Sequence, residues 1–331
     1  MPDKAMSMER AGWSSEDPVQ RPVMLTIAGD SAAGKTTLTK GLVEALGEAN
    51  VTAVCADDYH RYDREERKTL PFTPLNPKCN YIEIMEQHLE LLANGQPILK
   101  PKYDHSTGTF GRPEFVEARR FVIVEGLLPM YTRLAQACAD VTVYLDPPEA
   151  IRRAWKIARD STKRGYTKEQ VVEELERREA ESAEFIRPQR AKADIVVSFG
   201  PLQQAEDGLW PHAHAHEDSG GETLSATLLL RPTVTHPDLT SVLTDENRRA
   251  IHLKLIRDDD GKPVDALHVH GHAPPDLTHQ VEEALWRGLE FGEDADLPQG
   301  IGGIEGVRNE PLAVTQLILV YHLLQLAAER R

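Results

Sequence analysis

Short apolar runs and helical stripes alternate along residues 22–200. Each run holds five or six mostly apolar residues, which is typical of a strand buried on both faces of a sheet. The segments between them repeat apolar residues every three or four positions, which predicts amphipathic helices. The predicted strands are 23–28, 51–56, 121–125, 141–145 and 194–199, and the predicted helices lie near 35–47, 80–94, 148–160 and 168–183. This alternation predicts a doubly wound α/β fold, with a mostly parallel sheet and helices on both faces.

The pattern changes after residue 200. Residues 201–222 collect Pro, Gly, Gln and acidic residues with three alternating histidines, which indicates a linker or a surface loop. Residues 223–331 predict a C-terminal α+β extension. Its predicted strands are 223–231, 250–257 and 264–270, and its predicted helices are 276–290 and 311–328. Residues 1–21 mix charges with Ser and Pro and lack an apolar core, so we expect a disordered tail and no secretory signal.

The composition favours a soluble enzyme. The 331-residue chain carries a formal net charge of −15, which argues against binding of nucleic acid or of an anionic membrane surface. Its three cysteines form no disulfide framework, so we expect a reducing, cytoplasmic location. The apolar stretch 313–328 is interrupted by Gln316, His322 and Gln325, which suits a buried or interfacial helix better than a membrane span.

Residues Gly29 to Thr36 match the phosphate-binding pattern G-x-x-x-x-G-K-[ST], and they lie between a predicted strand and a predicted helix. In such a loop glycines let backbone N–H groups turn toward phosphate oxygens, a lysine adds a point charge and the Thr hydroxyl can bind Mg²⁺. The residues predicted to bind the nucleotide are Gly29, Asp30, Ser31, Ala32, Ala33, Gly34, Lys35, Thr36 and Thr37. The loop therefore predicts a protein that handles a nucleoside triphosphate.

Acidic residues follow at the ends of two predicted strands, where parallel sheets hold their ligands. Asp57 and Asp58 come directly after the second strand, and either is placed to accept or orient the proton of a hydroxyl that is being phosphorylated. Glu125 ends the third strand, where an acid can bind or orient Mg²⁺. An Asx turn or a helix cap would explain one isolated Asp, but the dense cluster up to Arg64 favours phosphoryl transfer.

A run of cations extends from Lys156 to Arg164, near the end of the predicted helix 148–160. Preorganised cations stabilise the charge that spreads over the oxygens of a transferring phosphoryl group, and loss of one such donor costs roughly 10²–10³ in rate. A solvated basic helix face with i,i+4 pairs explains the same run. The residues by themselves favour the two interpretations about equally.

The combination of GDSAAGKTT, ADDYHRYDR, KPKYDHSTG, VEGLLPMY and KIARDSTKRGYT resembles the phosphoribulokinase family over most of residues 22–200. The segment from about residue 226 resembles the C-terminal part of the longer members. The resemblance implies a P-loop kinase that uses ATP and Mg²⁺ to phosphorylate C1 of ribulose 5-phosphate, the Calvin cycle step that precedes carbon fixation. It also implies a homodimer or larger homo-oligomer, which the apolar C-terminal helix favours.

The resemblance assigns roles to individual side chains. It implies that Asp57 is the catalytic base, that His60 and Arg64 bind the sugar phosphate and that Glu125 lies at the metal-binding strand end. The hairpin that lines the acceptor site in relatives matches Tyr103 and His105. The predicted set is catalytic Asp57, Lys35, Arg159 and Arg164; substrate-binding His60, Arg64, Tyr103, His105 and Lys156; and metal-binding Thr36, Glu125 and Asp160.

Other phosphate-loop proteins are the competing interpretations. A GTPase would carry an N-K-x-D guanine signature, which the sequence lacks. A catalytically silent relative would be expected to have lost Asp57, Glu125 or Lys35, and all three are present. The alternative that stays open is a uridine kinase-like or pantothenate kinase-like enzyme that acts on another hydroxyl acceptor.

The cysteine pattern departs from that of thioredoxin-regulated members of the family. Those members pair a cysteine of the phosphate loop with one that lies two residues before the catalytic Asp, whereas this chain has Ala33 and Cys55 at the two positions. The resemblance therefore implies that this regulatory disulfide cannot form, and we expect a buried, inert Cys55 thiol. Histidines alternate within 212–216 and within 268–272, and we predict no metal site at either.

Overall fold

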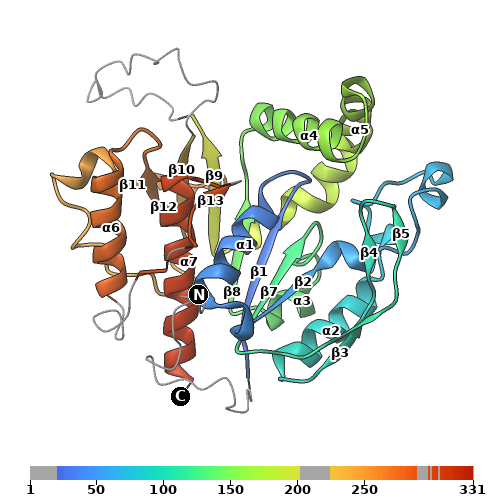
Figure 1. Cartoon of the computed structure of the whole chain (residues 1–331), viewed down its shortest axis with the longest axis horizontal. Helices are drawn as coiled ribbons and strands as arrows, with labels where there is room; N and C mark the ends of the chain where they lie inside the picture. Colours follow the sequence, from blue (N-terminus) through green and yellow to red (C-terminus); the bar gives the residue numbers. More distant parts are fainter. Residues whose placement is uncertain (1–20, 202–223, 289–296, 299, 305, 331) are drawn as a thin grey trace.

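The computed structural model describes residues 21–201, 224–288, 297–298, 300–304 and 306–330 (Figure 1). The predicted N-terminal tail and the predicted linker fall outside the described residues, apart from Arg21 and Pro201.

One eight-stranded sheet forms the centre of the molecule, and five of its strands are parallel in the order β9-β8-β1-β7-β2. They are β1 (Val23–Gly29), β2 (Val51–Cys55), β7 (Phe121–Gly126), β8 (Val141–Leu145) and β9 (Ile195–Gly200). In the register of the sheet, Glu125 pairs with Ile27 of β1 and with Cys55 of β2. The carboxyl ends of β1, β2 and β7 therefore meet at one edge, and the predicted parallel α/β fold is confirmed.

The remaining three strands of the sheet come from the C-terminal segment and are antiparallel. They are β10 (Ser225–Leu230), β11 (Ile251–Arg257) and β12 (Pro263–Val269). β10 pairs with β9, and β12 then lies between β10 and β11. The C-terminal segment thus continues the sheet of the phosphate-loop part instead of forming a sheet of its own.

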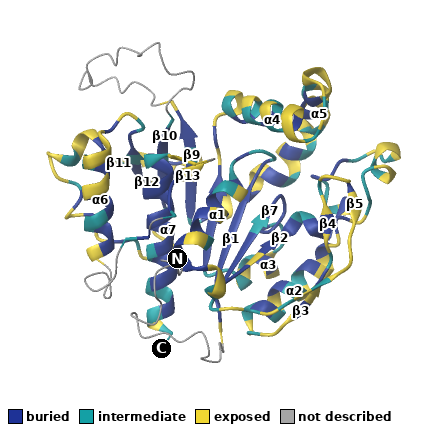
Figure 2. Cartoon of the chain, in the orientation of Figure 1, coloured by how far each residue is buried: buried dark blue, intermediate teal, exposed yellow. Residues whose placement is uncertain are grey.

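Helices cover both faces of the sheet because alternate strand residues point to opposite sides. On one face Leu25 and Ile27 of β1 pack with the three helices α1 (Lys35–Leu46), α6 (Pro275–Arg287) and α7 (Glu310–Glu329). On the other face Met24 and Val124 pack with α2 (Ile82–Ala93) and α3 (Arg133–Cys138). The central strands β1, β7, β8 and β9 are buried on both sides (Figure 2), which explains their continuous apolar runs.

The helices α4 (Glu149–Lys163) and α5 (Lys168–Glu181) lie beyond the carboxyl ends of the strands, at the top of Figure 1. Both are rich in charge and bury few apolar side chains. The predicted helices match the observed ones within a few residues. The second of these two is extended by a π-helical turn, Ser182–Ile186, that the apolar pattern does not indicate.

The helix α7 is long and apolar enough, by length and composition alone, to cross a membrane. It packs instead between α1, α6 and the sheet, and 78% of its apolar window is buried inside the fold. A helix that is apolar all round is expected at such a place. The interpretation of this stretch as a buried helix fits its position.

Smaller elements were not apparent in the sequence pattern because they are too short to show a period. They include the ribbons β3 (Ile98–Lys100) with β6 (Glu114–Val116), β4 (Tyr103–Asp104) with β5 (Thr109–Phe110), and β13 (Gly303–Ile304) with β14 (Val307–Arg308). Short 3₁₀ helices are Glu48–Asn50, Ala56–Tyr59 (η2), Glu66–Thr69, Pro77–Cys79, Arg187–Lys192 and Asn247–Arg249. The ribbon β4–β5 and η2 line the site described next.

Candidate active site

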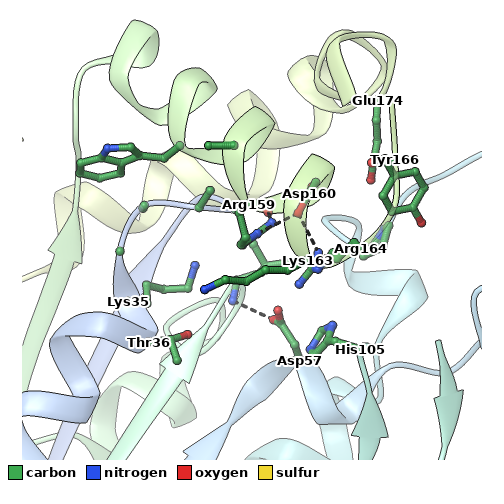
Figure 3. A pocket seen from close by; sticks show the side chains of 18 of the residues that line it. Lys35, Thr36, Asp57, His105, Arg159, Asp160, Lys163, Arg164, Tyr166 and Glu174 are labelled. Atoms are coloured by element: carbon green, nitrogen blue, oxygen red, sulfur yellow. Dashed lines mark hydrogen bonds and ion pairs between the residues drawn. The ribbon is translucent and has the colours of Figure 1, made fainter. Parts of the chain in front are cut away.

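A cavity of about 1360 Å³ opens at the carboxyl ends of β1, β2 and β7. The phosphate loop forms its floor, η2 and the β4–β5 hairpin form one wall, and α4 and α5 lie over it (Figure 3). This is the edge at which open parallel sheets bind ligands. Most of the side chains predicted for the site line this cavity, although they come from distant parts of the chain.

The backbone of the phosphate loop takes conformations that few residues adopt. Gly34 has φ +99°, and a Cβ on Gly29 would lie 2.8 Å from the carbonyl oxygen of Leu145. Ala32 is left-handed at φ +65°, the one such non-glycine among the described residues. The Lys35 ammonium folds back and donates to the carbonyl oxygens of Gly29 and Asp30, each at 2.9 Å. The loop is thus held open around the space that a phosphate would occupy.

The Asp30 side chain braces the loop from behind. Its carboxylate accepts from the Ser31 N–H at 2.6 Å and from the Ser182 hydroxyl. Arg152, which is buried, lies 3.5 Å from the same carboxylate and donates to the Ser31 carbonyl at 3.1 Å. These contacts point the carboxylate away from the cavity. We therefore restrict the predicted nucleotide contact of Asp30 to its backbone.

Thr36 and Glu125 face each other across the floor of the cavity. The Thr36 hydroxyl donates to Glu125 Oε1 at 3.0 Å. Burial raises the pKa of Glu125, Asp57 adds to the rise, and Lys35 opposes it. A hydroxyl and a carboxylate at the end of a phosphate loop are hard oxygen donors, which suit Mg²⁺ with its remaining positions filled by water and phosphate. The two side chains therefore fit the predicted metal.

The adjacent residues Asp57 and Asp58 point in different directions. Asp57 projects into the cavity, and its Oδ1 accepts from the Leu127 N–H at 3.2 Å (Figure 3). Burial opposes its ionisation, but the net pKa is lowered by His60, Lys35 and other neighbours, so Asp57 is a carboxylate. A carboxylate aimed at the space beside the phosphate loop can accept a proton from a bound hydroxyl.

Asp58 is held by contacts within the protein and does not face the cavity. Its carboxylate forms a buried ion pair with the Lys100 ammonium and accepts from the Tyr103 N–H at 2.8 Å. These contacts fasten the β3 and β4 ribbons to η2. Of the two acids that the sequence left open as the proton acceptor, only Asp57 lines the cavity.

Three aromatic side chains stand beside Asp57. The His60 Nδ1 lies 2.7 Å from Asn80 Oδ1, and its ring meets the edge of Tyr103 at 5.0 Å between centroids. Tyr103 makes the same kind of contact with His105, also at 5.0 Å. Burial lowers the pKa of His60 to about 4, so its ring is neutral near pH 7. The predicted acceptor-binding residues are thus brought together by packing between η2 and the β4–β5 hairpin.

Two arginines reach the cavity from the segment after His60. Arg64 donates to the carbonyl oxygen of His105 at 2.5 Å. Arg67 was not predicted, although it follows Arg64 by about one helical turn, which is the signal that could have identified it. Its guanidinium bonds the Tyr103 hydroxyl and lies 4.9 Å from the centre of that ring. Its Nη1 is buried and has no hydrogen-bond partner among the described residues.

Asp160 is the centre of the cation run on α4. It is 1% exposed and bonds Lys156 Nζ at 2.7 Å. Arg159 Nε lies 2.8 Å and Arg164 3.4 Å from the same carboxylate (Figure 3). Burial opposes ionisation, but Arg159 and Lys156 lower the pKa of Asp160 to about 2. The cations converge on one buried acid, two of them through i,i+4 pairs, instead of spreading over a solvated face.

Two predicted roles change as a result. Both oxygens of Asp160 bond cations of its own helix, so its predicted metal contact is not supported and we assign it the positioning of those cations. Lys156 is 1% exposed in its pair with Asp160, and its predicted substrate contact is likewise replaced by a structural role. Arg159 and Arg164 do line the cavity, and Arg159 Nη2 lies 3.4 Å from the Ser31 hydroxyl of the phosphate loop.

The cavity has an apolar end that the sequence analysis missed. It is lined by Trp155 of α4, Phe199 of β9, and Leu224, Ile304 and Leu312 of the C-terminal segment. These side chains come from distant parts of the chain, and no local pattern marks them as neighbours. A flat apolar group, such as a nucleobase, suits this end of the cavity.

Comparison with known proteins agrees with this geometry. Residues 24–206, more than half of the chain, match the family described as Phosphoribulokinase / Uridine kinase. The chain is 38% identical over 189 residues to a phosphoribulokinase of Synechocystis sp., covering 57% of each chain. It is 31% identical over 230 residues to a chloroplastic phosphoribulokinase of Triticum aestivum, covering 64% of this chain and 54% of that one. The alignments therefore span little more than half the length of these relatives.

A solved structure shows the same fold. The phosphoribulokinase from Rhodobacter spheroides superposes with a TM-score of 0.55 at 18% sequence identity, over 80% of this chain and 99% of that one. The match extends beyond residues 24–206 and so includes part of the C-terminal segment. From its phosphate loop, its strand-end acids and these relationships, the chain belongs to the phosphoribulokinase / uridine kinase family.

Proposed function

We propose that this protein is a phosphoribulokinase that transfers the γ-phosphate of ATP to the C1 hydroxyl of ribulose 5-phosphate. The products are ribulose 1,5-bisphosphate and ADP, and the reaction serves the Calvin cycle. The observation that carries the proposal is the position of Asp57, which faces the cavity between Lys35 and Thr36 of the phosphate loop on one side and His105 on the other. The names of the Synechocystis and wheat relatives support this choice of acceptor.

ATP would bind with its phosphates on the backbone of residues 29–37 and with its base at the apolar end of the cavity. Thr36 and Glu125 would hold Mg²⁺, which neutralises charge on the phosphate oxygens when it is bound. Lys35 is placed to contact the same oxygens after releasing the carbonyls of Gly29 and Asp30. These groups bind and orient the donor and leave the proton transfer to other residues.

The acceptor would lie between η2, the β4–β5 hairpin and α4. Arg64 and Arg67 supply positive charge for its phosphate, while His60 and His105 border its hydroxyls. Asp57 would take the proton of the C1 hydroxyl as that oxygen bonds to the γ-phosphorus and the bond to the β-phosphate oxygen breaks. The proton then resides on the Asp57 carboxyl and ADP leaves.

The cations Lys35, Arg159 and Arg164 would stabilise the transferring phosphoryl group. Asp160 holds Arg159 and Arg164 in place through ion pairs. These two cations therefore need no reorganisation when negative charge develops on the phosphoryl oxygens. Catalysis would then consist mainly of positioning and of charge stabilisation.

An acceptor screen tests the proposal. The purified chain is incubated with MgATP and, separately, ribulose 5-phosphate, ribose 5-phosphate, uridine or pantothenate, and ADP release and the phosphorylated product are measured. We expect turnover with ribulose 5-phosphate far above that with the other acceptors. Turnover of uridine or pantothenate in its absence would replace this proposal with the uridine kinase-like or pantothenate kinase-like alternative.

We also propose a cytoplasmic homo-oligomer that binds neither nucleic acid nor membranes. The net charge of −15 and the absence of any disulfide among the three cysteines support this setting. Edge strand β11 exposes Leu255 at the free side of the sheet, where a second copy could associate. Sedimentation of the purified chain would test the oligomeric state.

A further inference from the structure

Three side chains of different chemistry converge beside the phosphate loop. Cys55 ends β2, Asp57 follows it in η2, and His105 comes from the turn between β4 and β5. Their potential ligand atoms, a sulfur, a carboxylate oxygen and a ring nitrogen, all lie within 4.8 Å of one another. Within the parts of the chain that the structure describes, no other cluster of His, Cys, Asp or Glu meets this condition.

The donor set differs from that of the magnesium position. Thr36 and Glu125 offer only oxygen, which suits Mg²⁺, whereas a thiol with an imidazole and a carboxylate suits a softer ion such as Zn²⁺. Three protein ligands leave a fourth tetrahedral position open, and the cavity supplies the space for a water there. The carboxylates of Asp57 and Glu125 contribute negative charge near the thiol.

We propose that Cys55, Asp57 and His105 form an inhibitory binding site for a thiophilic divalent cation, with Zn²⁺ as its representative. On binding, the Cys55 sulfur forms a bond to the metal and its proton passes to water, with no change in oxidation state. The Asp57 carboxylate is then a ligand and can no longer accept a proton from the acceptor hydroxyl. This inhibitory consequence rests on the proposed kinase function, whereas the binding itself does not.

The proposal also accounts for a cysteine that the reaction does not use. Cys55 lies in the cavity wall and is half-buried, unlike the fully buried thiol expected from the sequence, and it has no disulfide partner. Cys138, at the end of α3, is equally half-buried but lies outside the cavity. The two thiols therefore form a matched pair for a test.

Metal binding is measured first, without any assay of activity. Zn²⁺ is titrated against a chromophoric chelator in the presence of the native chain, Cys55→Ser and Cys138→Ser. We expect the native chain and Cys138→Ser to bind one equivalent more than Cys55→Ser. Co²⁺ should give a thiolate-to-metal charge-transfer band in the first two proteins and not in Cys55→Ser. His105→Gln removes a ligand without altering β2. It should weaken the affinity for this additional Zn²⁺ by about tenfold or more.

Equal stoichiometry in the native chain and in Cys55→Ser, or a cobalt complex without the charge-transfer band, would overturn the site. Zn²⁺ is then added to the kinase assay in the presence of Mg²⁺. We expect inhibition that a chelator reverses in the native enzyme and in Cys138→Ser, and retained activity in Cys55→Ser. Equal inhibition of Cys55→Ser would overturn the inhibitory role. Stoichiometric binding by a chain that phosphorylates no acceptor would instead refute the proposed function and leave the metal site standing.

Discussion

Gly41 of α1 lies directly against the side-chain amide of Gln316 in α7, with no room for a Cβ between them. The Gln316 amide is buried, donates to the Leu38 carbonyl at 3.3 Å and accepts from the Gly302 N–H at 2.7 Å. The helix that follows the phosphate loop is therefore tied to the last helix of the chain by a glycine and an amide. This contact places the C-terminal segment within reach of the nucleotide site.

Gly41→Ala is expected to destabilise the protein by about 1–3 kcal/mol, because the new methyl group overlaps the Gln316 amide. In an unstrained helix the same change would stabilise by about 0.5–1 kcal/mol. The free energy of unfolding is measured in urea for Gly41→Ala, Gln316→Ala and the double variant. In the Gln316→Ala background, Gly41→Ala should no longer lower the free energy of unfolding, because the overlapping amide is gone. An equal cost in both backgrounds would show that the overlap is not its cause.

Asp57→Asn should lower kcat by about 10²–10⁴ while leaving the affinity for ATP nearly unchanged, because the proposed proton acceptor is lost and the phosphate loop is intact. Asp58→Asn is the matched control. It breaks the buried pair with Lys100 and should lower the Tm more than Asp57→Asn does. Steady-state kinetics and thermal unfolding of both variants give the comparison. Near-normal turnover of Asp57→Asn would remove Asp57 from its proposed role.

Arg64→Ala should raise the KM for the sugar phosphate with a smaller effect on the KM for ATP, because its guanidinium lines the cavity beside His105, where we propose that the acceptor binds. Arg61 is a suitable control, since it lies outside the cavity lining and 5.1 Å from the Tyr81 ring centre. Arg61→Ala should leave both constants close to those of the native enzyme. An unchanged KM for the acceptor in Arg64→Ala would exclude the contact.

Stability is expected to fall as the pH decreases from about 6.5 toward 4. Burial of His322 in α7, together with the nearby His236, lowers its pKa to about 4 from the usual 6.5. In this window the unfolded chain binds a proton at this residue and the folded chain does not, so protonation favours unfolding. Above about pH 6.5 both states carry the neutral ring and the full stability is present.

Urea unfolding at about pH 7 and about pH 5 checks this expectation. His322→Gln should show a smaller loss of unfolding free energy between the two conditions than the native chain. The exposed His279 of α6 provides the control, and His279→Gln should lose as much as the native chain. A loss in His322→Gln as large as that of the native protein would contradict the assignment to this buried ring.

Features that are encoded locally could be predicted from the sequence. The strand at 141–145 has the predicted bounds, and the strands around it differ by a residue, because burial on both faces requires an unbroken apolar run. The phosphate loop could be located because its glycines and Lys35 lie close together in the sequence and form a single backbone turn. The β4–β5 hairpin was indicated only by the family resemblance, since two-residue strands show no period.

The sequence by itself determined the sheet, the helices and the nucleotide loop of this protein, because each depends on residues that are neighbours along the chain. Only the tertiary structure decided that Asp57 faces the cavity while Asp58 turns to Lys100, 42 residues away. It also decided that Asp160 gathers the cations of α4 and that Gln316 locks α7 onto α1. The contacts of Asp58 and Gln316 join side chains that are far apart in the sequence. Long-range packing determines such contacts, and the local sequence pattern does not.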